Sequence, residues 1–346
     1  MSSEEGKFKH TEAGLIPEEW RISTLSELAL KITKGTTPTT IGGRFTDNGI
    51  NFVKVECLND DGTISKEKFM YVDEETNELL SRSELQINDL LYSIAGTIGR
   101  VSIVTGDILP ANTNQAVAII RPNLGKINLY YLRYALVNPK LKNYLLSKVV
   151  HAVQANLSLT EIGNCPIPIP KPKEQQSIAK ILSDLDAKIA VNVKMNRALE
   201  AVGQTVFKRW FVDFDFPNEE GKPYKSSGGE FATSELGMIP KDWCVEKISD
   251  VLELAYGKAL KETNRNPSKT PVYGSNGPIG WHDERLVEGP GIIVGRKGNP
   301  GTVTWSNTDF FPIDTTFYVV PKGSAKSLYY LFYLLKEQNL ASLIVD

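Results

Sequence analysis

GLIPEEW (residues 14–20) and GMIPKDW (residues 237–243) present one seven-residue pattern twice in a single chain. The match extends upstream, because FKHTEAGLIPEEW (8–20) and FATSELGMIPKDW (231–243) share Phe, Glu, Gly, Ile, Pro and Trp in register. Repetition at this spacing indicates two copies of one domain in the chain.

The repeat reappears further along both copies. DLLYSIAGTIGRV (89–101) aligns with GIIVGRKGNPGTV (291–303), which places two glycines and a valine on equivalent positions. LYYLRYAL (129–136) then matches LYYLFYLL (328–335). The second copy is shorter, mostly because it lacks the acidic insert around residues 61–84, and loops are where such insertions are tolerated.

Each copy is predicted to be a mixed α/β domain. A short helix follows the repeated Trp, short β runs bounded by Gly-rich turns come next, and an aromatic-rich amphipathic helix closes the copy. We interpret the recurring Pro, Gly and Trp as turn and core residues rather than as catalytic residues.

Between the copies, residues 173–211 run without proline and carry a heptad pattern. About 38 residues at ~1.5 Å each give a helix about 57 Å long. We interpret it as a coiled-coil-type helix, with a helix packed lengthwise on its own domain as the alternative. The predicted seam, which also includes Gly203, is Ile178, Leu182, Leu185, Ile189, Asn192, Asn196, Leu199, Val206 and Trp210.

The expected organisation is therefore two α/β domains joined by one long helix. The second copy stops at Asp346, opposite Ser147 of the first, so a second long helix is expected to be missing. The predicted segments are domain 1 at 8–147, an extended connector at 148–172, the helix at 173–211, a flexible linker at 212–230 and a truncated domain 2 at 231–346.

Composition indicates an ordinary globular protein. Its 346 residues are 41% hydrophobic and 23% charged, with a net charge of −2. Three scattered cysteines support neither a disulfide framework nor a zinc site, and no secretory signal or membrane span is evident. We expect a cytoplasmic protein, and the charge alone does not indicate a DNA partner.

No catalytic or metal-binding constellation is evident, so we expect no metal and no catalytic residue. The chain has no P-loop, and its three histidines are far apart in sequence. The nearest approach to a nuclease motif is Asp213 or Asp215 followed by Glu220 and Lys222, but these lie in the Gly/Pro/Ser-rich linker, which is a poor scaffold for metal ligands.

Small polar and basic residues on tight turns are the better candidates for a binding surface. Asn and Arg can contact base edges, while Lys and backbone amides contact phosphates. Solvated turns often have this composition, so each turn alone is weak evidence. The candidates are Lys34, Thr36, Thr37, Arg44, Lys54 and Arg100 in copy one, and Lys258, Ser275, Asn276, Arg296, Lys297 and Asn299 in copy two.

Taken together, the sequence resembles the specificity (S) subunit of type I restriction-modification systems. The repeated G-[LM]-I-P-x-x-W opening, PIPIPKPKEQQSIAKIL (166–182) and the YGSNGPIG…GRKGNPG pattern carry the resemblance. It implies two target-recognition domains, each reading one half of a bipartite double-stranded DNA target. It also implies a non-catalytic chain whose helix docks methyltransferase subunits, joined by a restriction/translocase subunit. S-adenosylmethionine, ATP and Mg²⁺ then belong to those partners, and this chain holds no cofactor.

Several alternatives stay open at this point. A fragment, a natural truncation and half of a homodimer formed through the long helix would each account for the missing second helix. An inactive scaffold or recombination-reservoir copy that binds partner subunits but no DNA is the second functional interpretation. A single-chain enzyme is the third.

Overall fold

The computed structural model describes residues 7–148, 150–151, 155–323, 327–338 and 340. The chain divides into two compact units, Met1–Asn192 and Val193–Asp346. None of the described helices is both long enough and apolar enough to cross a membrane.

The first unit contains many short strands and a few short helices ahead of one long helix. The strands are β1 Phe8–Thr11, β2 Gly14–Pro17, β3 Arg21–Thr24, β4 Ala29–Lys34, β5 Phe45–Thr46, β6 Ile50–Val53, β7 Met70–Val72, β8 Leu90–Ser93, β9 Val101–Ile103, β10 Ala111–Thr113, β11 Val117–Pro122, β12 Val150–His151, β13 Ala155–Asn156 and β14 Pro166–Ile169. The α-helices are α1 Leu25–Leu28, α2 Glu74–Leu79, α3 Leu129–Val137, α4 Pro139–Ser147 and α5 Leu159–Gly163, with 3-10 turns at Pro38–Ile41, Val55–Cys57, Lys66–Lys68, Ser81–Ser83 and Gly106–Ile108. The long helix α6, Pro172–Phe207, begins in this unit and continues into the second unit from Val193.

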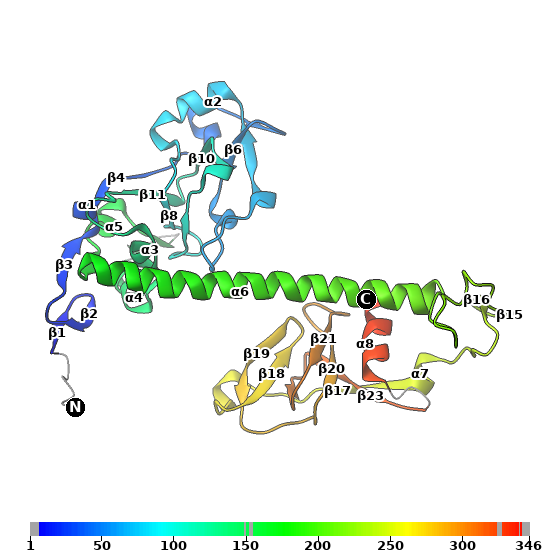
Figure 1. Cartoon of the computed structure of the whole chain (residues 1–346). Coiled ribbons are helices and arrows are strands. Elements are labelled where there is room, and N and C mark those ends of the chain that lie inside the picture. The colour runs from blue at the N-terminus through cyan, green and yellow to red at the C-terminus, as the bar shows by residue number, and fades with distance from the viewer. Residues whose placement is uncertain (1–6, 149, 152–154, 324–326, 339, 341–346) are drawn as a thin grey trace. The chain divides into compact units, whose positions relative to one another are not determined.

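Two four-stranded sheets organise this unit (Figure 1). One has the order β4-β11-β8-β9 with antiparallel pairing, and the other has the order β10-β6-β7-β5, in which β10 and β6 are parallel. Parallel pairing of β6 with β10 brings the residues after Val53 next to Thr113.

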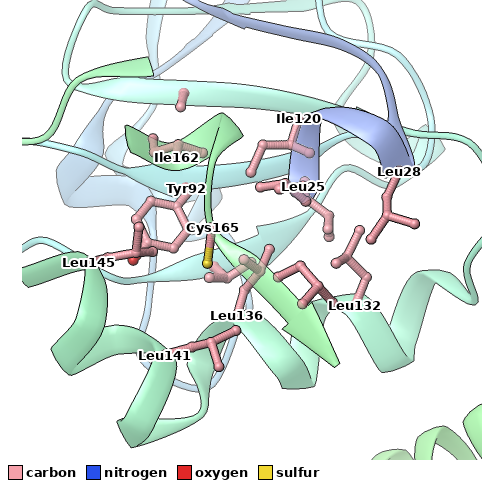
Figure 2. Close-up of a cluster of buried hydrophobic side chains, with 14 of the residues drawn as sticks. Leu25, Leu28, Tyr92, Ile120, Leu132, Leu136, Leu141, Leu145, Ile162 and Cys165 are labelled. Carbon is pink, nitrogen blue, oxygen red and sulfur yellow. The ribbon is translucent and has the colours of Figure 1, made fainter. Parts of the chain in front are cut away.

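The main core lies between the β4-containing sheet and helices α3, α4 and α5. Figure 2 shows Tyr92 and Cys165 inside it, surrounded by leucine and isoleucine side chains from these helices and from α1. Burial raises the pKa of the Cys165 thiol to about 12, so the thiol stays protonated and serves as a small apolar side chain.

Residues 148–172 differ from the extended connector predicted for them. They contain α5, and β14 pairs antiparallel with β3, with Ile167 fully buried. Because Pro lacks an N–H donor, alternate prolines suit an edge strand, so PIPI is extended as part of a sheet rather than as a free spacer.

The long helix predicted at 173–211 is confirmed as α6, which begins at Pro172 and ends at Phe207 (Figure 1). A π-helical turn, Lys208–Val212, follows directly. Pro172 occupies the first helical position, where its fixed φ and missing N–H cost nothing.

The second unit repeats the arrangement of the first. Its strands are β15 Phe231–Ser234, β16 Gly237–Pro240, β17 Leu252–Tyr256, β18 Thr270–Gly274, β19 Gly277–His282, β20 Gly291–Gly295, β21 Val303–Ser306, β22 Phe311–Pro312 and β23 Thr316–Pro321. Its helices are α7 Ile248–Val251, α8 Leu328–Glu337 and a 3-10 turn at Glu262–Asn264. The sheet order β17-β23-β20-β21 corresponds to β4-β11-β8-β9, and parallel β18–β22 corresponds to β6–β10. The predicted mixed α/β repeat is confirmed.

Residues 212–230 also differ from the flexible linker predicted by their composition. Phe216 stacks on Tyr224 and on Trp243, with ring centroids 4.7 and 5.2 Å apart, and Asp215 accepts hydrogen bonds from the backbone and hydroxyl of Ser226. The aromatic residues within the segment supply the packing that its Gly, Pro and Ser residues could not.

Candidate nucleic-acid interface

Three turns of the second unit meet around residues 312–316. Lys258 donates its backbone N–H to Pro312, and Arg296 and Lys297 donate theirs to the Thr315 carbonyl, at 2.9 and 3.0 Å. Ser275 Oγ donates to the same Thr315 carbonyl at 2.7 Å. Segments that are distant in sequence therefore form one surface.

Glycine makes this convergence possible. A Cβ on Gly257 would lie 2.1 Å from the Ile313 carbonyl oxygen, and one on Gly295 would lie 2.2 Å from that of Asn299. Both contacts are closer than any side chain permits, so only glycine lets these backbones approach. Asn299 Nδ2 also donates to Asn276 Oδ1 across the surface. All six sequence-predicted residues of copy two are brought together here.

The basic residues of this surface are not neutralised by neighbouring carboxylates. Among the described residues, Lys258, Arg296 and Lys297 form none of the ion pairs within 4.0 Å. Lys258 and Lys297 are exposed, and Arg296 is half-buried. The surface thus keeps its positive charge for an anionic ligand.

The corresponding surface of the first unit lies at residues 113–118. Thr36 donates its backbone N–H to Thr113, Thr37 donates its hydroxyl to Gln115, and Lys34 pairs with Ala118 in the sheet. Lys54 follows β6 beside Thr113, because Thr113 Oγ1 donates to the Val53 carbonyl. Four of the six predicted residues of copy one therefore gather near one place.

The other two predicted residues of copy one lie elsewhere. Arg44 is beside α2 and pairs with Asp73 at 2.8 Å, while Arg100 pairs with Asp60 through both Nε and Nη2 at 3.0 Å. Lys54 is itself paired with Glu56. Hydrogen bonds from Arg100 hold the pKa of Asp60 below its ordinary value. Three of the four cations predicted for this unit are thus already neutralised.

Sequence reasoning missed the aromatic residues of the second surface. Tyr256 and Phe317 face each other across β17 and β23, and the Arg296 guanidinium carbon lies 4.8 and 5.8 Å from their ring centroids. Tyr256 is 65% exposed. The sequence did show a basic residue on a turn and aromatic residues at the ends of strands. Which aromatic residues lie beside Arg296 depends on the strand register, which the sequence pattern did not supply.

The predicted helix seam is packed near the start of α6 and exposed in its middle. Ile178 and Leu182 line a cavity of about 320 Å³ in the first unit, together with Trp20, Tyr131 and Tyr134. Other seam residues stay exposed, including Leu185 (53%), Ile189 (61%) and Leu199 (62%). The first part packs on its own unit and the second presents apolar side chains to solvent.

Gly203 of the predicted seam faces its own unit. A Cβ there would lie 2.1 Å from the Tyr333 hydroxyl oxygen of α8. Phe207, a turn later, stacks on Tyr333 with centroids 5.9 Å apart. The last turns of α6 therefore pack on α8 of the second unit.

Within the part of the chain that the structure describes, no group of three or more His, Cys, Asp or Glu side chains is arranged to hold a metal ion. Asp215, part of the weak nuclease-like pattern, accepts hydrogen bonds from Ser226, and its pKa is lowered by these bonds.

Comparisons with known proteins agree with this architecture. The family model described as the type I restriction modification DNA specificity domain matches residues 17–201 and 240–345. The putative type I restriction enzyme MjaX specificity subunit of Methanocaldococcus jannaschii is 31% identical over 263 residues, which cover 74% of this chain and 57% of that protein. The MjaIX specificity subunit of the same organism is 26% identical over 293 residues, covering 82% of this chain and 62% of that protein.

Among solved structures, the type I restriction-modification S subunit from M. genitalium is similar, with a TM-score of 0.49 and 16% identity over 92% of this chain and 79% of that one. The chain spans about three fifths of the length of the two curated relatives. Since the family model matches both copies of the repeat, the protein belongs to the type I restriction modification DNA specificity domain family.

Proposed function

We propose that this chain is a DNA-binding specificity subunit of a type I restriction-modification complex, and that each unit reads one half of a bipartite double-stranded target. One observation carries the proposal: two units with the same sheet order each bring polar and basic turn residues to the equivalent place. Two such surfaces in one chain suit a target with two separate parts.

The two surfaces would bind DNA differently. In the second unit, Lys258, Arg296 and Lys297 form no ion pair with any described carboxylate and would contact DNA directly. In the first unit, Lys34, Thr36 and Thr37 are the first candidates. Lys54, Arg44 and Arg100 would have to leave Glu56, Asp73 and Asp60 before they could contact phosphates.

The exposed apolar face of α6 supports a docking role for the helix. Large apolar side chains in water forfeit about 1.5–3 kcal/mol each relative to burial. We propose that methyltransferase subunits cover this face, that a restriction/translocase subunit joins them, and that a homodimer through α6 is the alternative. The chain itself would be non-catalytic and act in the cytoplasm, with S-adenosylmethionine, ATP and Mg²⁺ held by the partners.

The net charge of −2 is compatible with this division of labour. Phosphate neutralisation dominates the affinity of most DNA-binding proteins. If the methyltransferase subunits enclose the DNA, they supply most of those contacts, and this chain supplies chiefly the base contacts.

A methylation map of the host genome, made with and without the gene, tests the proposal. Loss of methylation at one bipartite motif is the expected result. An unchanged map, with the gene expressed, would contradict an active specificity subunit.

The neutralised cations of the first unit favour one second candidate, a scaffold that binds partner subunits but not DNA. Co-purification with the methyltransferase subunit, without retention of any DNA by the complex, is the outcome that would favour it. Cleavage of DNA by the purified chain with Mg²⁺ alone would instead revive a single-chain enzyme.

A further inference from the structure

The guanidinium of Arg296 is held on an aromatic platform. Tyr256 and Phe317 are direct cross-strand partners, and their rings meet edge to face with centroids 5.0 Å apart. The Arg296 guanidinium carbon lies 4.8 Å from the Tyr256 centroid and 5.8 Å from that of Phe317. Stacking of this kind orients the planar guanidinium and restricts its rotamers.

Hydrogen bonds to backbone carbonyls also hold the main chain and the side chain of Arg296 in place. Its N–H donates to the Thr315 carbonyl at 2.9 Å, and Nη1 donates to the Asp314 carbonyl at 3.2 Å. A guanidinium carries five N–H donors, so one is used and four remain. No described carboxylate pairs with it. The side chain is therefore ordered, charged and still able to donate two parallel hydrogen bonds.

The first unit has nothing equivalent at this position. Ile94 donates its backbone N–H to Ala116 as Arg296 does to Thr315, so the two residues correspond, and Ile94 is buried. Sheet register likewise places Lys34 and Ala118 where the second unit has Tyr256 and Phe317. The platform is specific to one unit, as expected of a feature that distinguishes the two half-sites.

We propose that Arg296 reads a guanine in the half-site recognised by the second unit, and that Tyr256 is the positioning residue that holds the guanidinium for this contact. The inference rests on the proposed function. A guanidinium fork matches O6 and N7 of guanine in the major groove, whereas a phosphate contact requires no such fixed plane. Neighbouring Lys297, which is exposed and has no ion-pair partner among the described residues, is suited to the phosphate.

The test is selection from a randomised double-stranded DNA library by the chain purified with its methyltransferase subunit. The unmodified protein should enrich a motif with a G·C pair in one half. Arg296→Ala and Arg296→Lys should each reduce discrimination at that pair by about 5- to 150-fold and leave the other positions unchanged. The Lys variant keeps the charge, so it isolates the loss of the fork.

The platform is tested by a matched pair of variants at one exposed position. Tyr256→Leu removes the ring and should reduce discrimination at the same G·C pair by about 2- to 5-fold. Tyr256→Phe keeps the ring and should behave as the unmodified protein. Equal behaviour of the two variants would overturn the positioning role.

Lys297→Ala supplies the contrasting result, a uniform loss of affinity for all sequences with a shallower salt dependence. If Arg296→Ala gives the same uniform loss, or changes only an A·T position, the guanine contact is overturned while the proposed function stands. If the unmodified complex enriches no sequence at all, the proposed function itself fails.

Discussion

Arg133 of α3 donates through Nη1 to Asp186 Oδ2 of α6 at 2.9 Å, and through Nη2 to the backbone carbonyl of Asp61. The Arg133 side chain is 8% exposed and that of Asp186 is 47% exposed. Tyr134 Oη donates to the same Asp186 oxygen at 2.7 Å. One arginine thus connects the long helix to the loop that is closed by the isolated Leu58–Ile64 bridge.

Replacement of Asp186 should loosen the first unit from its helix. Asp186→Ala leaves the buried Arg133 without its charged acceptor, which we expect to cost about 1–2 kcal/mol of unfolding free energy, reduced because Asp186 is half exposed. Thermal or urea denaturation of the chain measures this loss. The control is Asp184→Ala, which removes only an exposed i, i+4 pair with Lys180 and should cost a few tenths of a kcal/mol. Equal effects of the two changes would contradict the role of Asp186.

The close approach of Gly203 to Tyr333 leads to a second prediction about α6. Ala is a better helix former than Gly by about 1 kcal/mol, so Gly203→Ala in an open helix would stabilise it. Here the added Cβ would meet the rigid Tyr333 ring, and we expect a lower melting temperature. With Tyr333→Ala as background, the same change should become neutral or stabilising. A stabilising Gly203→Ala in the unmodified chain would show that the helix does not pack closely on α8.

Asp73 should make the first unit sensitive to acid. It caps α2, and hydrogen bonds from Thr76 and Arg44 lower its pKa from 3.8 to about 2. A carboxyl with a depressed folded-state pKa contributes stability that is complete above about pH 4 and is lost as the pH falls through about 2. Asp73→Asn keeps a good cap but no charge, so its melting temperature should vary less with pH over this window. Glu78→Gln on the same helix is the control and should keep the acid dependence of the unmodified chain.

The sequence repeat and the heptad spacing correctly predicted the two similar domains and the long helix. The repeated Gly-Ile-Pro-Trp opening indicated two equivalent domains, and the apolar spacing after Pro172 indicated α6. Both features could be predicted because a duplication and a helical period are patterns of residues that are close together in the sequence. The ordering of residues 212–230 was missed because its aromatic residues pack on Trp243, which is a tertiary contact.

The sequence predicted which residues form the candidate DNA surface of the second unit, but it did not predict which of the candidate cations are paired with carboxylates. Turn composition pointed to Ser275, Arg296 and Lys297, which the structure brings together. It could not show that Arg44 and Arg100 pair with carboxylates about 30 and 40 residues away in sequence. Ion pairing and the Tyr256 platform depend on strand register and loop path, which no local pattern specifies.

The exposed face of α6 carries the last prediction. Leu185 and Ile189 lie one turn apart on the helix and are 53% and 61% exposed. Met195 and Leu199, on the part of α6 that belongs to the second unit, are 54% and 62% exposed. Large apolar side chains left exposed along a helix indicate a site of protein association. The alternative interpretation was that the long helix packs along its whole length on its own domain. Only the two ends of α6 pack in this way.

We therefore expect the isolated chain to self-associate or aggregate through α6 unless methyltransferase subunits cover it. Leu185→Asp combined with Ile189→Asp should abolish both dimerisation and partner docking, because two carboxylates would have to be desolvated at the interface. Both units should stay folded, since neither side chain belongs to a buried core. Ala187→Asp combined with Ala190→Asp places the same charges about half a turn away and should leave association intact. Light scattering measures the outcome, and a stable monomer of the unmodified chain at micromolar concentration would refute the association.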